Sequence, residues 1–425
     1  MGGAARGRET SPRLGSCAAG SRADHHGVSP ASPKSQATPQ GAAVPAGHPD
    51  LDGLTREIGI KDDGRDGPLV IVTAGLHGNE PGGVRALRAL FAALEGTPTA
   101  GRIVGLTGNL AALRIGARHQ GQDLNRMWTE DTLRALGARP PEDDTADESE
   151  LRALFSTIEA ERDAARGRSR EAILVDLHST SADGGAFSVV PDSLPSRRLA
   201  RDIGLPVVLG LEERIEGTLL TWLVAQGDTS TVVEGGQHEA GSTRDVLLAS
   251  LWVVLDHAGV LLEGDDRVEQ ARRRLLQARD DAPEVLDLIY AHSIEEGEDF
   301  VMRSGWRNFM HVDDGLVLAD QRGHEVDAPL SGYMLMPLYQ GLGTEGFFLC
   351  RAVGRPWLFA SRLLRRSWIE HALRLLPGVL SLDARAGRIL ARRGAPRWMA
   401  RLLRLFGYRK NAPTRDVTEW TRRPQ

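Results

Sequence analysis

The sequence of 425 residues predicts an α/β fold in which a mixed sheet is flanked by helices. Short β-branched runs alternate with helical patterns as far as residue 280, and the first strong run ends in a glycine-rich turn. After Asp281 the chain changes to short apolar runs separated by turn signals, which indicates a second, smaller β-rich domain. In such sheets ligands gather beyond the carboxyl ends of the strands, so the turns after strands are the first candidates for function.

The first predicted strand spans residues 69–72, and a helical pattern follows its glycine-rich turn at residues 84–91. The acidic stretch 141–150 is expected to be a solvated loop that enters a helix at Leu151. The remaining expected strands are residues 102–106, 173–177, 187–190, 207–209 and 231–233, and the remaining helices are residues 151–165, 194–203, 219–225 and 246–262.

The length exceeds the usual size of one domain, and the composition divides the chain into four parts. Residues 1–50 are rich in Gly, Ala, Ser and Pro and are expected to form a disordered extension. Residues 51–280 are expected to form the catalytic domain, residues 281–355 the β-rich domain and residues 356–425 a basic helical tail.

Charge and cysteine content limit the class of protein. The formal net charge of -5 is small for this length and argues against nucleic acid as a partner. No apolar run approaches the roughly 20 residues that a membrane helix needs. Cys17 and Cys350 cannot build a disulfide framework, and the first 49 residues lack the apolar segment of a secretory signal, so we expect a cytoplasmic location.

The turn after the first strand carries His77 and Glu80, whose side chains can converge on one cation. Hydrolytic zinc sites take three protein ligands of this type and leave one position for water. His178 ends the strand 173–177 and is the expected third ligand, with Asp176 on the same strand face able to orient an imidazole. The alternative for His178 is a core histidine whose ring bonds to the backbone.

A hydrolytic site also needs a group that takes a proton from water and passes it to the leaving group. Glu234 closes the strand 231–233, and Gly235 and Gly236 after it leave room for a substrate. The sequence therefore indicates Glu234 as the general base. A solvent-facing glutamate at a strand end is the competing interpretation.

A third cluster runs from Arg118 to Arg126. Its arginines and Asn125 offer donors for a substrate carboxylate and for the oxyanion that develops during hydrolysis. The alternative is a loop that simply pairs Asp123 with an arginine.

Taken together, these segments resemble the succinylglutamate desuccinylase and aspartoacylase family, which is itself similar to the zinc carboxypeptidases. The resemblance covers about residues 69–353 and rests on four motifs in the family's order. They are GLHGNEP at residues 75–81, DLNR at residues 123–126, DLHST at residues 176–180 and Glu234-Gly235.

The resemblance implies a carboxypeptidase-like fold and one zinc ion per chain, held by His77, Glu80 and His178. It implies Glu234 as general acid and base and Arg118 as the residue that polarises the scissile carbonyl. Binding of a substrate carboxylate falls to two residues of the third cluster, Asn125 and Arg126.

The expected reaction is hydrolysis of an amide or ester bond in a small N-acylated amino acid or related carboxylate, by a water that the metal and Glu234 activate. Residues 219–231 contain no Tyr or Arg, unlike the aspartoacylase branch, so the acyl group is left open. The alternatives are a zinc carboxypeptidase acting on peptide C-termini and a non-catalytic metal-binding protein.

In the tail, Arg362, Arg365, Arg366 and Arg404 alternate with Leu, Trp and Phe. Such segments can lie on an anionic membrane surface, can pack on the domain through their arginine stems, or can contact a second copy of the chain in a homo-oligomer. Peripheral membrane contact is the less favoured of these interpretations.

Overall fold

The computed structural model describes residues 48–167, 172–261, 264–295, 298–340, 343–383, 386–392, 394, 396–410 and 417–423. Nearly all of the predicted disordered extension, including Cys17, lies outside these residues. Of that extension, the structure describes residues 48–50, where the short 3-10 helix η1 (Pro49–Leu51) begins. Among the described helices, none combines the length and the apolar character needed to cross a bilayer.

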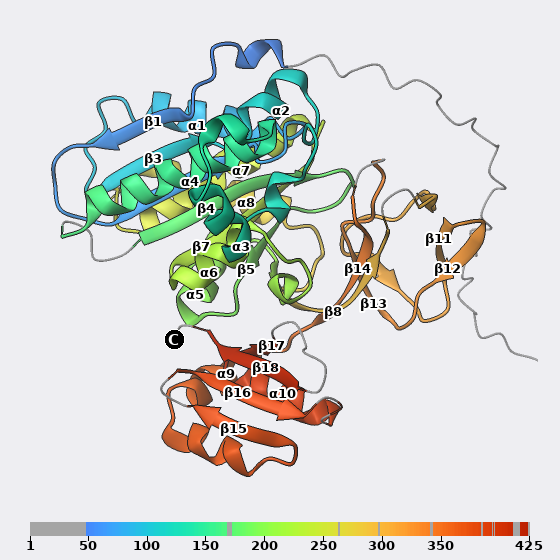
Figure 1. Cartoon of the computed structure of the whole chain (residues 1–425). Helices are drawn as coiled ribbons and strands as arrows, with labels where there is room; N and C mark the ends of the chain where they lie inside the picture. The colour runs from blue at the N-terminus through green and yellow to red at the C-terminus, as the bar shows by residue number, and fades with distance from the viewer. Residues whose placement is uncertain are drawn as a thin grey trace, which may run out of the picture. The chain divides into compact units, whose positions relative to one another are not determined.

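A large mixed sheet built from strands between residues 57 and 352 organises most of the described chain (Figure 1). Its strand order in the described residues is β1-β3-β2-β4-β7-β5-β6-β8-β14-β13-β10. Strands β3, β2, β4 and β7 are parallel neighbours, whereas β5 runs antiparallel to β7 and β1 antiparallel to β3. The bounds are β1 (Glu57–Asp62), β2 (Leu69–Ala74), β3 (Arg102–Thr107), β4 (Ala172–Thr180), β5 (Phe187–Val190), β6 (Val207–Leu209), β7 (Thr229–Gln237), β8 (Val285–Ser293), β10 (His311–Val312), β13 (Gly332–Leu335) and β14 (Glu345–Ala352).

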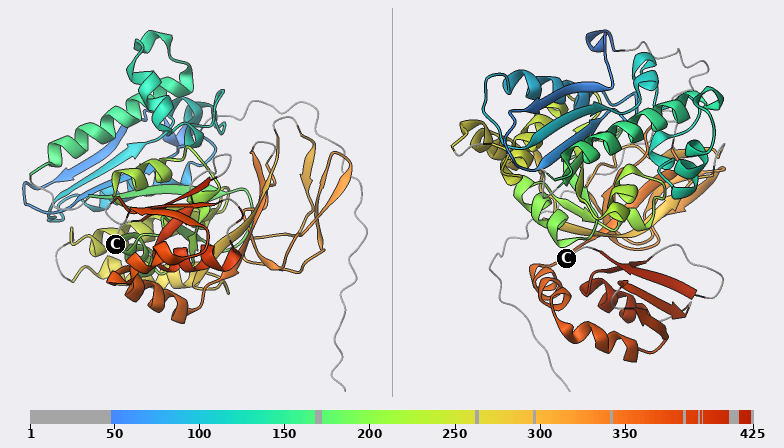
Figure 2. Two further views of the ribbon diagram at one scale, coloured as in Figure 1. Left: turned by 60° about the horizontal axis from the view of Figure 1, so that its bottom comes forward. Right: turned by 60° about the vertical axis from the view of Figure 1, so that its left-hand side comes forward.

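Helices cover both faces of this sheet, which confirms the predicted fold class (Figure 2). All six residues of β2 are buried: Val70 and Val72 face one core with α1, α7 and α8, while Leu69 and Ile71 face a second core with α4. Burial on both faces explains why this strand is a continuous apolar run. The helices are α1 (Gly82–Ala93), α2 (Leu110–Ile115), α3 (Glu130–Gly137), α4 (Ala146–Ala165), α5 (Leu194–Ile203), α6 (Leu219–Gln226), α7 (Gly241–His257) and α8 (Asp266–Ala278).

Half of the acidic stretch that was expected to be a loop, residues 146–150, is the start of α4, so that prediction was wrong for this half. After the 3-10 helix η3 (Pro141–Asp143), Thr145 caps α4, and its hydroxyl and the Glu148 carboxylate each accept the other residue's backbone N–H. This reciprocal cap has a recognisable sequence, Thr followed by Glu three residues later.

Residues 285–352 contain the predicted β-rich texture. Strand β8 pairs with β6 and with β14, and β14 pairs in turn with β13, so this region extends the large sheet. A second, three-stranded sheet has the order β12-β11-β9, built from β9 (Phe300–Met302), β11 (Val317–Gln321) and β12 (His324–Asp327).

The tail is helical only in part, which corrects the expectation of a helical segment. Helices α9 (Arg355–Arg365) and α10 (Arg397–Leu405) and the 3-10 helix η5 (Trp368–Leu375) accompany a four-stranded sheet. Side chains of β16 alternate between exposed and buried, and Ile389 and Ala391 pack on α10. This period of two was hidden because leucine and arginine fit a helix equally well. The strands are β15 (Val379–Asp383), β16 (Arg388–Arg392), β17 (Tyr408–Lys410) and β18 (Val417–Arg422).

Candidate metal centre and active-site pocket

Three neighbouring parallel strands bring the predicted site residues to one rim of the sheet. The register pairs Ala74 of β2 with Leu177 of β4, and His178 of β4 with Glu234 of β7. His77 and Glu80 lie in the turn that follows β2. The carboxyl ends of these strands therefore meet at one place, as the pattern predicted.

The turn after β2 is fixed by its glycines. A Cβ at Gly78 would lie 2.1 Å from the carbonyl carbon of Ala112 and 2.4 Å from the carbonyl oxygen of Ala117, so no side chain fits there. The Gly78 N–H donates to the Arg118 carbonyl at 3.2 Å. This close approach ties the loop that carries Arg118 to the turn that carries His77.

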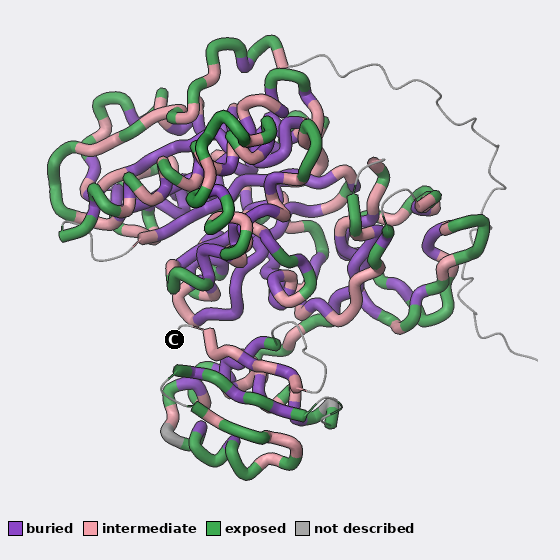
Figure 3. The backbone as a smooth tube through the Cα atoms, viewed as in Figure 1, coloured by how far each residue is buried: buried purple, intermediate pink, exposed green. Residues whose placement is uncertain are grey.

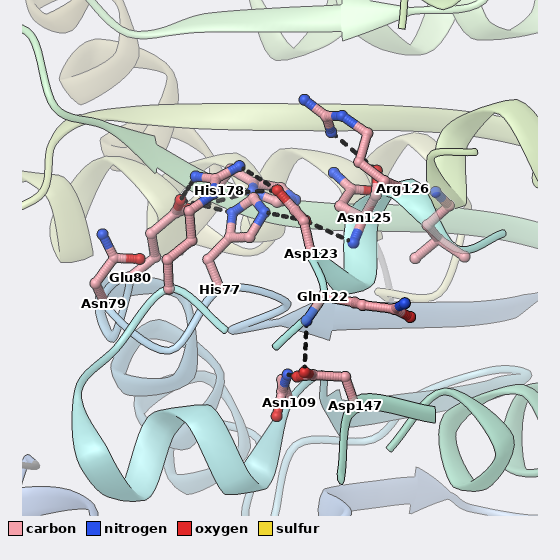
Figure 4. Close-up of polar contacts among 12 residues, drawn as sticks. His77, Asn79, Glu80, Asn109, Gln122, Asp123, Asn125, Arg126, Asp147 and His178 are labelled. Carbon is pink, nitrogen blue, oxygen red and sulfur yellow. Dashed lines mark hydrogen bonds and ion pairs between the residues drawn. The ribbon is translucent and has the colours of Figure 1, made fainter. Parts of the chain in front are cut away.

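His77, Glu80 and His178 form a compact cluster with one ligand atom from each within 4.8 Å of the others (Figure 4). Glu80 lies between the two rings: its Oε1 is 2.8 Å from Nδ1 of His77, and its Oε2 is 3.1 Å from Nδ1 of His178. All three side chains are nearly inaccessible to solvent.

The remote nitrogen of each imidazole contacts a further carboxylate. Nε2 of His77 lies 3.1 Å from Asp123, and Nε2 of His178 lies 2.7 Å from Asp176. When each ring donates its Nε2 hydrogen to that carboxylate, both Nδ1 lone pairs point at the carboxylate of Glu80. Three acceptors then converge on one point, an arrangement that requires either a bound cation or an extra proton.

The pKa values of His178 and Glu80 also show that positive charge is favoured between these side chains. Burial lowers the pKa of His178, but the charges of Asp176 and Glu80 outweigh burial and raise it well above its ordinary value. Burial likewise raises the pKa of Glu80, yet the two histidines hold it well below its usual range. Two imidazoles and one carboxylate are a donor set that zinc and several other divalent ions accept, so the residues present fit a metal.

Glu234 lies close to this cluster, and its pKa is raised, whereas the pKa of Glu80 is lowered. Its side chain is buried, and Oε2 has no hydrogen-bond partner among the described residues. Burial raises the pKa of Glu234 to about 8, with Glu80 and Asp176 adding to the effect and His178 and Arg118 opposing it. A carboxyl group with this property can hold and release a proton near neutral pH.

Arg118 forms the ion pair that was considered as the alternative interpretation of its loop. Its Nη2 and Nε donate to Oδ2 of Asp123 at 2.8 and 3.1 Å. Its Nη1 lies 3.8 Å from Oε1 of Glu80, at the edge of the cluster. Asp123 therefore contacts both His77 and Arg118. Arg118 pairs with Asp123 and at the same time lies beside the metal cluster.

Asn125 and Arg126 belong to the 3-10 helix η2 (Leu124–Arg126). Oδ1 of Asn125 accepts the N–H of Leu219 at 3.0 Å, which leaves the amide nitrogen as a donor. Arg126 already pairs with a carboxylate of the chain: its Nη2 lies 2.9 Å from Oε2 of Glu345 on β14. The β-rich region therefore contributes a wall to the site.

A cavity of about 140 Å³ joins these groups. Its lining includes every residue that the sequence assigned to the site: His77, Glu80, Arg118, Asn125, Arg126, His178 and Glu234. Apolar side chains such as Ile215 and Phe348 complete the walls. The pocket thus combines the metal cluster, a buried carboxyl group and two guanidinium groups.

His238 is a pocket residue that the sequence analysis missed. Its Nδ1 lies 2.7 Å from the hydroxyl of Ser179, and Nε2 has no partner within the described part of the chain. Burial lowers the pKa of His238. Its position four residues after Glu234, beyond the two glycines, was the available signal.

Asp147 was also missed, because the acidic stretch was assigned no function. Its carboxylate accepts the N–H groups of Gln120, Gly121 and Gln122 at 3.3, 2.7 and 2.9 Å, and the amide of Asn109 at 2.9 Å (Figure 4). The start of α4 therefore holds the loop that carries Arg118 and Asp123.

Comparisons with known proteins point to one family. Residues 66–246, which contain all seven predicted site residues, match the family described as the succinylglutamate desuccinylase/aspartoacylase catalytic domain. A succinylglutamate desuccinylase of Pseudomonas syringae pv. tomato is 29% identical over 278 residues, which are 61% of this chain and 74% of that protein. One of Shewanella amazonensis is 30% identical over 119 residues, 28% of this chain and 33% of that protein.

The solved structures that this chain resembles include the product-bound ectoine utilization protein EutE (DoeB) from Ruegeria pomeroyi. Its TM-score is 0.47 at 21% identity, covering 68% of this chain and 85% of that chain. The succinylglutamate desuccinylase from Chromobacterium violaceum has a TM-score of 0.48 at 17% identity, covering 69% of this chain and 87% of that chain.

Proposed function

We propose that this chain, whose residues 66–246 match the succinylglutamate desuccinylase/aspartoacylase family, is a zinc-dependent hydrolase that cleaves an amide or ester bond of a small N-acylated amino acid or related carboxylate. The observation that carries this proposal is the convergence of three buried acceptors, from His77, Glu80 and His178, beside the partly unpaired carboxyl group of Glu234. A structural metal site would use four protein ligands and would not need a proton acceptor next to it.

One zinc ion per chain would be held by His77, Glu80 and His178, where it would act as a Lewis acid and lower the pKa of a coordinated water. Asp123 and Asp176 orient the two imidazoles through their Nε2 atoms. Such outer carboxylates fix the ring tautomer and raise the basicity of the ligand.

Glu234 is the proposed general base and acid. Its oxygen accepts a proton from the attacking water and returns it to the departing amine or alcohol. A raised pKa makes the ionised Glu234 a stronger acceptor for the first transfer, and the carboxyl group that results can hold the proton until the leaving group takes it. The glycines after Glu234 do not line the pocket: a Cβ at Gly235 would lie 2.5 Å from Cγ of Leu247, so this glycine permits close packing against α7, and the expectation that it leaves room for the substrate was wrong.

Arg118 is the proposed oxyanion donor. Asp123 binds its Nε and Nη2 and fixes the guanidinium plane, while Nη1 faces the metal cluster. A cation fixed in this way stabilises charge as it develops on the carbonyl oxygen and needs no reorganisation during the reaction.

Asn125 and Arg126 are proposed to bind a carboxylate of the substrate. The Asn125 amide nitrogen is a donor, and Arg126 offers a planar, forked guanidinium. A substrate carboxylate at Arg126 would compete with Glu345, so the ion pair between β14 and η2 becomes part of substrate selection.

The test is a hydrolysis screen of N-acyl amino acids, small esters and a blocked dipeptide, combined with metal analysis of wild type and Glu234→Gln. We expect about one zinc per chain in both proteins. Turnover should be about 10²- to 10⁴-fold lower in the variant. Glu269→Gln, at an exposed position on α8, is the matched control and should behave as wild type.

The outcome of the screen also tests the two alternative functions. Preference for the blocked dipeptide over every N-acyl amino acid would replace the proposal with a carboxypeptidase. A metal whose removal unfolds the protein, in a chain that hydrolyses none of the three classes, would support a structural metal site instead.

We also propose a cytoplasmic location. The support is the cysteine content: two cysteines in 425 residues, of which Cys350 is free and buried in the β-rich region. A thiol that stays reduced suits a reducing compartment.

A further inference from the structure

Helix α9 and the following 3-10 helix η5 expose large apolar side chains. The exposed fractions are 64% for Phe359, 56% for Leu363, 45% for Ile369 and 78% for Leu375. Exposed and buried stretches alternate along the C-terminal region (Figure 3). Helix α10 buries Met399 and Leu403 in the core of that region, although Trp398 on the same helix is 50% exposed. The mixture of arginine and large apolar side chains that the tail sequence shows is therefore exposed on α9 and η5. We call this surface the α9–η5 face.

The exposed charges on the α9–η5 face are cationic. Glu370 is the one acidic residue between positions 355 and 375, and it is buried where its carboxylate accepts the hydroxyl of Tyr408 and pairs with Arg422. Arg362, Arg366 and Arg374 are exposed and form no ion pair with any residue that the structure describes.

A groove of about 530 Å³ lies between α9 and α5. Its lining includes apolar residues such as Val207, Leu209 and Leu358, together with Arg198 and Arg201 of α5 and Arg362 and Arg366 of α9. Glu284, the acidic residue of the lining, pairs with Arg355. Arg198 has no acidic partner among the described side chains either. The groove thus offers guanidinium groups from two elements around an apolar base, next to the exposed Phe359.

We propose that the α9–η5 face docks on an anionic phospholipid surface, with Phe359 and Leu363 entering the acyl boundary and the arginine-rimmed groove receiving a headgroup phosphate. Arginine binds phosphate through paired N–H donors, and apolar side chains beside it add the burial that a purely electrostatic contact lacks. Clustered arginines close to an anionic leaflet each add to the attraction.

Two other occupants fit the face less well. A nucleic acid would leave Phe359, Leu363 and Leu375 in water, because a duplex backbone offers them no apolar surface. A second copy of the chain related by two-fold symmetry would bring the same unpaired arginines against each other, since such an interface uses one patch twice.

The experiment is co-flotation of the full chain with vesicles made of equal parts of phosphatidylglycerol and phosphatidylcholine, compared with pure phosphatidylcholine vesicles, at low and at physiological salt. We expect the chain to float with the anionic vesicles and to stay behind with the neutral ones. Salt should weaken the interaction without abolishing it, because the apolar part of the contact is not screened.

Variants separate the two parts of the contact. Phe359→Ser with Leu363→Ser should lower partitioning at least about tenfold at both salt concentrations. Arg362→Glu with Arg366→Glu should remove most of the binding at low salt. The controls are Leu276→Ser, with an equally exposed leucine at 60%, and Arg273→Glu, both on α8, and neither should change binding.

The proposal is overturned if the chain ignores anionic vesicles, or if the control variants reduce partitioning as much as the variants on the α9–η5 face. It is also overturned if the wild type is a dimer in solution and Phe359→Ser yields a monomer while neither protein binds vesicles, because the face is then a subunit interface. Circular dichroism of each variant confirms that the fold is retained.

Discussion

Two clusters of buried charge in this chain balance their charges differently. In the metal cluster, His77, Glu80 and His178 direct three acceptors at one point without a cation of the chain between them. In the second cluster, Asp192 after β5 is fully buried, and the cations are supplied by Arg365 and Arg409 of the C-terminal region.

In the second cluster, each buried carboxylate pairs with at least one arginine. Asp192 Oδ2 lies 2.8 Å from Arg365 and 2.6 Å from Arg409, and Arg197 pairs with the other oxygen. Arg409 extends further to Glu213 at 2.6 Å and to Asp287 at 3.3 Å. The cluster therefore fixes the C-terminal region to β8 and to the segment after β6.

The difference between the clusters distinguishes a structural site from a functional one. Buried charge has to be compensated, and a guanidinium that is part of the chain does so permanently. A site that must bind and use an exchangeable cation leaves its acceptors facing each other. The pKa values of carboxyl groups are shifted in both clusters, so the feature that favours the proposed metal-binding role is the lack of a chain cation between the three acceptors, not a pKa shift.

The largest expected effect comes from removing a ligand of the metal cluster. His178→Ala should lose the metal, and with it turnover should fall to background, because two ligands cannot hold the ion against solvent. Metal content by mass spectrometry and the hydrolysis assay measure the two losses. The control His257→Ala, on α7, removes a comparable pair with Asp202 of α5, and it should keep both metal and turnover. Full metal content in His178→Ala would remove this residue from the site.

Removing a cation from the second cluster should lower the stability of the fold. Arg409→Met leaves Asp192 and Glu213 buried with fewer cations, and we expect the free energy of unfolding to fall by about 3–5 kcal/mol. Urea denaturation of the metal-free protein measures it. Arg388→Met breaks a pair with Glu419 that is largely exposed, and it should leave stability nearly unchanged. Equal losses in the two variants would contradict the structural role of the buried cluster.

The second cluster also predicts a pH dependence. Burial raises the pKa of Asp192, but Arg197, Arg365 and Arg409 outweigh burial and hold it well below its usual range. A carboxyl group with a lowered folded pKa adds stability that is present above its unfolded pKa, about 3.9, and is lost as pH falls. Wild type should therefore lose stability more steeply than Asp192→Asn between about pH 5 and about pH 3. Parallel urea midpoints over that range would show that Asp192 contributes nothing.

A smaller effect is expected at the carboxylates behind the metal ligands. Asp123→Asn keeps the size of the side chain but removes the charge that orients His77, so the metal should bind about 10- to 100-fold more weakly. Competition with a chromophoric chelator measures this affinity. Asp256→Asn, in an exposed pair with Arg272, serves as the control, and unchanged affinity in Asp123→Asn would assign Asp123 to Arg118 alone.

Sequence predicted the metal cluster better than the second cluster because the two are encoded differently. His77, Glu80, His178 and Glu234 all follow strands with clear apolar runs, so the rule for parallel sheets places them together. Asp192 and Arg409 are far apart in the chain, and Arg409 belongs to a strand of three residues. No local pattern connects them, because their partnership depends on how the C-terminal region packs.

The same reason explains the smaller misses. Asp147 supports the loop of Arg118 only because α4 begins earlier than its apolar pattern does. His238 becomes a pocket residue because β7 continues through two glycines, where a strand is usually expected to end. Periodicity locates elements, whereas tertiary packing decides which polar residues meet.

The smallest expected effect comes from the segment that links the two clusters. Glu213 of the 3-10 helix η4 (Leu211–Glu213) pairs with Arg404 at 3.3 Å, and the residues after it line the pocket and reach Asn125 through Leu219. Arg404→Met should loosen this wall of the pocket without touching the metal ligands.

We therefore expect Arg404→Met to raise KM about threefold, with kcat and metal content unchanged, because coupling of this kind amounts to about 0.5–2 kcal/mol. Steady-state kinetics with the best substrate of the hydrolysis screen separates the two constants. Arg401→Met, one turn earlier on α10 and exposed, provides the matched control. A fall in kcat with KM unchanged would mean that the linking segment acts on the reacting groups. An unchanged KM in Arg404→Met would mean that the second cluster stabilises the fold without setting the shape of the pocket.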